Sequence, residues 1–99
     1  MYNKHGDTMR KTIQAINAMR TQLGWDQTDD LVSLMGYLNE EVAELNQEIN
    51  KEVLDYQAIE EELADVLMVA LALADDLKLD VHTIIEKKMV HVIKKYENL

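Results

Sequence analysis

Apolar residues recur at intervals of three and four along almost the whole chain, and this spacing is the strongest constraint on its fold. It divides the chain into four amphipathic segments, Met9–Leu23, Leu31–Ile49, Gln57–Lys78 and Val81–Tyr96. The 99 residues include no proline and only three glycines, so little in the sequence could form the turns of a sheet. We therefore predict an all-α protein: one domain over residues 1–99, with four helices forming a bundle.

Residues that begin or end helices stand at the edges of these segments. Gly24 follows the first segment and is typical of a helix end, because glycine readily adopts the left-handed conformation found there. The stretch Thr28–Asp30 precedes the second segment, and Asp80 precedes the fourth, where each could cap a helix N-terminus. The connections between helices are therefore expected to be short.

The third segment contains nine consecutive apolar residues, Val66–Ala74. A helix that is apolar all the way round has to be buried on every side. Three other helices of so short a chain cannot easily surround it, so we predict that a homodimer or homotetramer completes the bundle. The alternative is a monomeric bundle with one unusually apolar central helix.

The charge balance excludes several partners. Ten basic residues against 19 acidic ones give a net charge of −9, which is the wrong sign for binding nucleic acid. The chain has no cysteine, no apolar run long enough to span a membrane, and no signal-peptide core in Met1–Arg10. These features predict a cytoplasmic protein that binds neither nucleic acid nor membrane.

Ten of the acids lie between Glu40 and Asp65, with Lys51 as the one base among them. Helical geometry places Glu41 within about 20° of Leu34 and about 40° of Leu45, inside the apolar stripe of its helix. Glu44 lies one turn further on. In the next helix, Asp65 shares a stripe with Val69, and Glu62 precedes it by one turn.

Two pairs of carboxylates, Glu41 with Glu44 and Glu62 with Asp65, therefore point toward the interior or its edge. Antiparallel helices would bring the pairs face to face. Desolvated carboxylates need protons, partners or a metal, and an all-oxygen set suits Mg²⁺, with Mn²⁺ as a substitute. The alternative is that these acids form an ordinary solvated face.

Lys88 and Lys95 share the apolar stripe of the last segment. They could approach the acidic cluster and neutralise a phosphate held by its metal, or they could extend along the helix edge into water. A carboxylate-bridged di-iron site is excluded because no glutamate has a histidine three residues after it, and no glycine-rich phosphate loop is present.

The stretches Leu38–Leu45 and Glu61–Leu67 together resemble the double acidic signature, E-E-x-x-E followed by E-x-x-D, of the MazG-like all-α nucleoside triphosphate pyrophosphohydrolases. Weaker points of similarity are Trp25–Thr28, Leu73–Ala74 with Leu79–Asp80, and Lys95–Tyr96. The resemblance spans roughly Trp25 to Tyr96.

This resemblance implies a Mg²⁺-dependent enzyme that cleaves a nucleoside or deoxynucleoside triphosphate to the monophosphate and pyrophosphate by means of a metal-activated water. The metal ligands would be Glu41, Glu44, Glu62 and Asp65. Glu40 would be a fifth carboxylate or, with Glu41, a catalytic group that orients the water. The implied substrate contacts are Lys88, Lys95, Trp25 and Tyr96.

One departure from the family pattern concerns the last helix. Many members have an asparagine shortly before the basic-aromatic pair, where this chain has Val92 and Ile93. Two alternatives to an active enzyme therefore remain open: a catalytically weak module that binds nucleotide or metal, and a helical oligomerisation protein.

Overall fold

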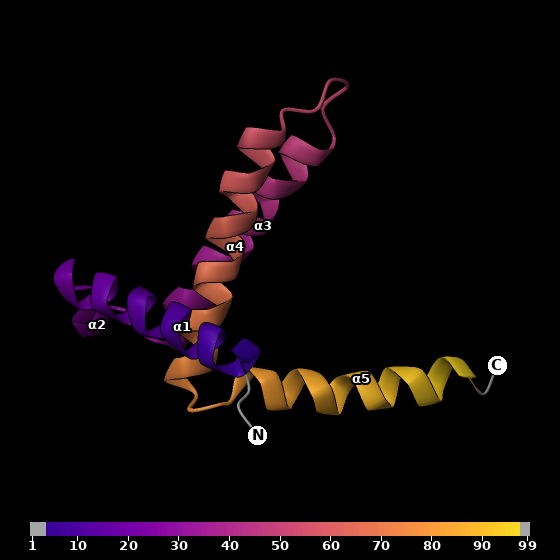
Figure 1. The fold of residues 1–99 in the computed structure, drawn as a ribbon. Helices are drawn as coiled ribbons and strands as arrows, with labels where there is room; N and C mark the ends of the chain where they lie inside the picture. The colour runs from indigo at the N-terminus through magenta and orange to yellow at the C-terminus, as the bar shows by residue number, and fades with distance from the viewer. Residues whose placement is uncertain (1–3, 98–99) are drawn as a thin grey trace.

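The computed structural model describes the chain from residue 4 to residue 97, with side chains from residue 8 onward, and it is built of helices (Figure 1). They are α1 (Lys4–Gln22), α2 (Trp25–Thr28), α3 (Leu31–Ile49), α4 (Tyr56–Asp76) and α5 (Val81–Glu97). No strand occurs among the described residues, so the all-α prediction is confirmed. The predicted number of four helices is wrong, because Trp25–Thr28 forms a short helix of its own.

The breaks between the helices follow from single residues. After α1, Gly24 has a φ of 77°, the left-handed conformation that glycine adopts without steric cost. Asp30 then caps α3 through a reciprocal pair of bonds with Ser33: the Ser33 amide donates to the Asp30 carboxylate at 2.8 Å, and the Asp30 amide donates to Ser33 Oγ at 2.8 Å. Such a capping box satisfies amide groups that a helix start otherwise leaves without partners.

Helices α4 and α5 also begin after an aspartate whose side chain caps the helix. Asp55 accepts a hydrogen bond from the Ala58 amide at 3.1 Å, and Asp80 accepts one from the Thr83 amide at 3.0 Å. The capping role predicted for Asp80 is therefore confirmed. Lys78, between α4 and α5, has a φ of 59°, the single positive φ among the described non-glycine residues.

Helices α3 and α4 form an antiparallel hairpin, and α1 crosses its base (Figure 1). Ile16 of α1, Leu34 of α3 and Ala72 of α4 are buried where the three helices meet, with Met68, Val69, Leu71 and Leu73 packed around them. Two polar contacts add to this junction. Asn17 Nδ2 donates to Asp75 Oδ2 at 2.7 Å, and Arg20 forms an ion pair with Asp76 at 3.0 Å.

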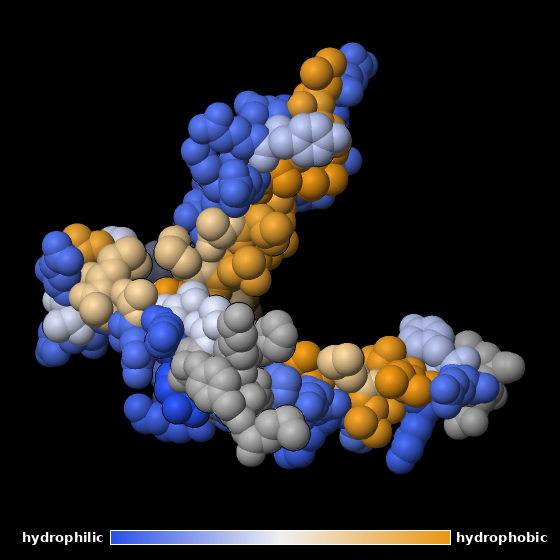
Figure 2. Space-filling view, viewed as in Figure 1, coloured by the Kyte–Doolittle hydropathy of each residue, from blue (hydrophilic) through white to orange (hydrophobic). Residues whose placement is uncertain are grey.

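Helix α5 leaves the base of the hairpin and extends away from it, so one chain does not close into a bundle (Figure 1). The radius of gyration is 16.0 Å, compared with about 13 Å for a compact domain of this length. Apolar surface lines both the hairpin and α5, on either side of the open angle between them (Figure 2).

The apolar run Val66–Ala74 is only partly covered within one chain. Ala72 is buried, but Leu67 is 53% exposed, and Leu63 one turn earlier is 44% exposed. The expectation that this helix is buried on every side is therefore not met by the single chain, and the predicted oligomer stays a prediction.

None of the helices in the described part of the chain is both long enough and apolar enough to cross a membrane.

Candidate functional site

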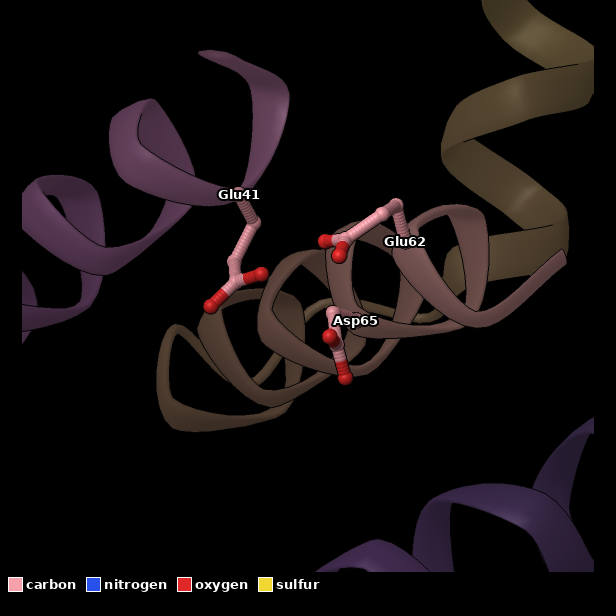
Figure 3. Close-up of side chains that lie close together, drawn as sticks. All are labelled: Glu41, Glu62 and Asp65. Atoms are coloured by element: carbon pink, nitrogen blue, oxygen red, sulfur yellow. The ribbon is translucent and has the colours of Figure 1, made fainter. Parts of the chain in front are cut away.

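Three acidic side chains converge between the two helices of the hairpin (Figure 3). Glu41 extends from α3, and Glu62 and Asp65 extend from α4; one carboxylate oxygen of each lies within 4.8 Å of the other two. All three side chains are partly buried. The E-x-x-D spacing explains the α4 pair, because residues three apart lie on the same face of a helix. We call Glu41, Glu62 and Asp65 the acidic cluster.

Glu44, the fourth carboxylate of the predicted set, is exposed but lies beside this cluster. Its charge and its hydrogen bonding raise the pKa of both Glu41 and Glu62. Glu40 is also exposed on α3, and it does not belong to the group whose oxygens converge. The structure therefore brings together three of the four predicted ligands, places the fourth beside them, and leaves Glu40 outside the converging group.

Burial and mutual repulsion shape the titration of the cluster. The pKa of Glu41 rises to about 7, first through desolvation and then through the negative charges of Glu44 and Asp65. Desolvation also raises the pKa of Glu62, followed by hydrogen bonding to Glu44. Both burial and the neighbouring acids therefore disfavour the charged forms of Glu41 and Glu62.

The cluster fits a hard divalent cation. One oxygen of Glu41 and one of Glu62, Oε2 in each, are buried and have no hydrogen-bond partner in the described part of the chain. A buried acceptor without a partner is destabilising, and a cation is one way to satisfy it. The ligand atoms are all carboxylate oxygens, which suit Mg²⁺ or Mn²⁺ and not a soft metal.

A pocket of about 470 Å³ opens beside the acidic cluster, between α1, α2, α3 and α4. Glu41 and Asp65 lie in its wall together with Trp25, Tyr37 and Arg20. The remaining lining is mostly apolar: Ile16, Met19, Thr28, Asp29, Leu34, Met68, Val69 and Ala72. A concave, mainly apolar site with a few convergent polar groups is typical of small-molecule binding.

Trp25 thus lines the same pocket as two of the acids, and its role in substrate binding stays a prediction. It begins α2, directly after the left-handed Gly24, and it stays 47% exposed. A half-exposed indole in the wall of a cavity can offer a flat face to a planar ring.

The other predicted substrate contacts are not brought to the cluster within one chain. Lys88, Lys95 and Tyr96 lie exposed on α5, which contributes no residue to the lining of this pocket. The Lys95 ammonium instead lies 5.7 Å from the centre of the neighbouring Tyr96 ring. Of the two alternatives for Lys88 and Lys95, the single chain has the second: both side chains are exposed on the helix.

Sequence reasoning missed Arg20, which the structure places in the pocket wall. Arg20 is only 6% exposed, and its two terminal nitrogens bind both oxygens of Asp76, at 3.1 and 3.0 Å. A signal was present in the sequence: Arg20 follows Ile16 by one helical turn and therefore lies on the apolar stripe of α1. Its partner, Asp76, lies far away along the chain and could not be identified from spacing.

Comparison with known families agrees with this geometry. Residues 29–98 match the family model of the MazG nucleotide pyrophosphohydrolase domain. The matched range includes the acidic cluster and Glu44 and leaves α1 and α2 outside. No match was found among curated proteins or among solved structures. Because the match spans well over half of the chain and the helical architecture agrees with it, the chain belongs to the MazG nucleotide pyrophosphohydrolase family.

Proposed function

We propose that this protein is a Mg²⁺-dependent hydrolase that cleaves a nucleoside or deoxynucleoside triphosphate between the α- and β-phosphates, releasing the monophosphate and pyrophosphate. The observation that supports this most directly is the convergence of Glu41, Glu62 and Asp65 at the edge of a pocket large enough for a small molecule. Family membership gives the reaction class, and the cluster provides the ligands that such a reaction needs.

In this proposal, Glu41, Glu62 and Asp65 hold Mg²⁺, and Glu44 joins them as a fourth ligand. Glu44 lies one turn after Glu41 on α3 and already hydrogen-bonds with Glu41 and Glu62. Mn²⁺ would bind the same oxygens. Glu40 stays exposed beside the site and would orient the attacking water.

A bound Mg²⁺ would neutralise phosphate charge and lower the pKa of a water molecule that attacks phosphorus. The acidic cluster itself repels a triphosphate, so the substrate can approach only when these carboxylates are occupied by cations. The apolar part of the pocket, with Trp25 and Tyr37 in its wall, then receives the nucleoside.

We further propose that the protein acts as a homodimer or homotetramer. The exposed apolar side chains on α4 and α5, such as Leu67, Met89 and Ile93, would be covered by a second copy. Assembly would also give the α5 residues Lys88, Lys95 and Tyr96 a route to the phosphates, which α5 does not provide within its own chain.

The test is incubation of the full chain with a panel of ribo- and deoxyribonucleoside triphosphates and Mg²⁺, followed by measurement of pyrophosphate. We expect turnover that stops with chelator and falls at least about 100-fold in Glu41→Gln and in Asp65→Asn, because each variant removes a metal ligand. Glu52→Gln, an exposed acid outside the cluster, is the matched control and should keep full activity.

Two other results would contradict the proposal that the protein is an enzyme. Nucleotide binding without pyrophosphate release would identify a binding module, which the Val92–Ile93 departure in α5 would help to explain. A protein that neither binds nor hydrolyses any nucleotide would be a helical oligomerisation protein with solvated acids.

A further inference from the structure

Arg20 is a buried cation with unused hydrogen-bonding capacity in the wall of the pocket. A guanidinium group has five N–H donors. Asp76 accepts from the two terminal nitrogens, and the Nε of Arg20 is buried without an acceptor in the described part of the chain. The Nε–H therefore has no acceptor among the described residues, while the bonds to Asp76 fix the plane of the guanidinium group. Each terminal nitrogen has two hydrogens, and one bond to Asp76 uses one of them.

The position of Arg20 separates it from the reacting phosphates. Asp76 lies eleven residues beyond Asp65 on α4, which corresponds to roughly 16 Å along the helix axis. A triphosphate held at the acidic cluster would thus place its phosphates at one end of the pocket. Its nucleoside would extend past Trp25 toward the Arg20 end.

The charge around Arg20 also favours a neutral ligand over a phosphate. Asp76 already neutralises the guanidinium, and Asp75 and Asp29 lie close enough for their charges to raise its pKa further. Among the described residues that line the pocket, Arg20 is the only base, and the acids that act on it are Asp76, Asp75 and Asp29, whereas Glu41 and Asp65 belong to the other end. The local field at this end is net negative, so an anionic group would be repelled and an uncharged acceptor accepted.

We propose that Arg20 is a specificity-determining residue that donates two parallel hydrogen bonds to the edge of a nucleobase carrying two adjacent acceptors, guanine or cytosine. Guanine offers O6 beside N7, the pair that arginine binds most often in nucleic acids. Cytosine offers O2 beside N3. Adenine places an amino donor beside N7, and uracil and thymine place an N–H between their two carbonyls, so each can accept only one of the two bonds.

This inference rests on the proposed function for the orientation of the substrate, because the acidic cluster must hold the phosphates. Trp25 supports the same orientation: it lines the pocket with Arg20, and an indole can stack on the face of a base whose edge is read by arginine. Asn17, one helical turn before Arg20, donates to Asp75 at 2.7 Å and so helps to hold α1, and with it Arg20, in place.

The experiment measures binding of the four nucleoside monophosphates GMP, CMP, AMP and UMP to the full chain with Mg²⁺ by calorimetry, alongside kcat/KM for the four triphosphates. We expect guanine or cytosine to be preferred over adenine and uracil by roughly 5- to 150-fold, the usual range for one bidentate pair. Arg20→Lys keeps the positive charge but removes the pair of parallel N–H donors, and it should reduce this preference to about twofold or less. The control Arg10→Lys, exposed on the same helix, should leave the preference unchanged.

A second probe changes the ligand and leaves the protein intact, so it does not depend on whether the variant folds. The 7-deaza form of GMP, or the 3-deaza form of CMP, lacks one of the two acceptors and should bind at least about fivefold more weakly than its parent. Equal binding of all four bases, a preference for adenine or uracil, or a preference that survives in Arg20→Lys would overturn the proposal. If no triphosphate is hydrolysed, the proposed function fails, while the monophosphate ranking still decides the role of Arg20.

Discussion

Glu41 on α3 and Asp65 on α4 hold carboxylate oxygens within 4.8 Å of each other across the hairpin, and both side chains are partly buried. With Glu62 they concentrate negative charge where water screens it incompletely. This arrangement links the stability of the fold to the cation that the site is proposed to bind, and several measurements can examine the link.

Mg²⁺ should stabilise the protein against heat. A ligand that binds the folded state alone adds about 2.7 kcal/mol at a concentration 100 times its Kd, which raises the Tm of a chain this short by roughly 10 °C or more. The measurement is a melting curve with and without 10 mM MgCl₂, with KCl at equal ionic strength as the control. An unchanged Tm would contradict cation binding at the acidic cluster.

Glu41→Gln should change activity and metal-free stability in opposite directions. The variant loses a ligand and therefore turnover, yet it also removes a charge that burial and three neighbouring acids disfavour. In chelator at pH 8 we expect the free energy of unfolding to rise by about 1 kcal/mol, measured by urea titration. Glu60→Gln, exposed on the same hairpin, should alter neither quantity. A loss of stability in Glu41→Gln would refute the repulsion argument.

The metal-free protein should become less stable as the pH rises from about 4.5 to about 7. Glu41 has a pKa of about 7 in the folded protein and an ordinary value of 4.5, so the folded state binds its proton more tightly. The stabilisation is fully present below pH 4.5 and is lost as the pH rises through 7. Urea titrations across this range in chelator measure the slope, which should flatten in Glu41→Gln.

The same titration predicts the pH dependence of metal binding. Mg²⁺ has to displace the proton of Glu41, so its apparent affinity should rise by up to about tenfold between pH 6 and pH 8. Calorimetric titration with MgCl₂ at several pH values gives this directly. Affinity that is independent of pH would place the cation away from Glu41.

Removal of Asp76 should destabilise the junction of α1 with the hairpin. Asp76→Ala leaves the buried guanidinium of Arg20 without its partner and should cost about 1–3 kcal/mol, reduced from the fully buried range because the Asp76 side chain is 32% exposed. Glu86→Ala breaks an exposed pair with His82 at 3.2 Å and should cost less than about 0.5 kcal/mol. Equal losses in the two variants would show that Arg20 is not held by Asp76.

Leu67→Glu should disrupt the proposed oligomer. The side chain is 53% exposed in the single chain, so a glutamate there costs little within the chain but would be desolvated in an interface. Sedimentation should show a dimer or tetramer for the wild type and a monomer for the variant. Gln47→Glu adds the same charge at an exposed polar position and should leave the assembly intact. A wild-type monomer at micromolar concentration would contradict the prediction.

Much of the architecture could be predicted because it is local. Helical spacing, the left-handed Gly24 and the capping aspartate Asp80 depend on residues a few positions apart. The approach of Glu41 to Asp65 could also be predicted, because both residues interrupt apolar stripes on consecutive helices that are joined by a short loop.

The rest depends on contacts that spacing does not encode. The bond between Arg20 and Asp76 joins residues 56 positions apart, and the direction of α5 depends on the backbone at Lys78, which adopts a left-handed conformation without being glycine. The sequence therefore places Lys88 and Lys95 on the apolar stripe of a helix, but it does not show which other helix that stripe faces. The short α2 was missed because its four residues are too few to show a period.

The family match begins at residue 29, so the pocket is lined partly by residues inside the match and partly by residues before it. The acidic end lies on the α3–α4 hairpin inside the match, whereas Arg20 and Trp25 belong to the segment before it. If both proposals hold, reaction chemistry and substrate choice lie on separate stretches of chain that meet only through folding. Exchange of the first 28 residues between relatives would then transfer a preference for one nucleotide and leave the proposed metal-binding residues in place.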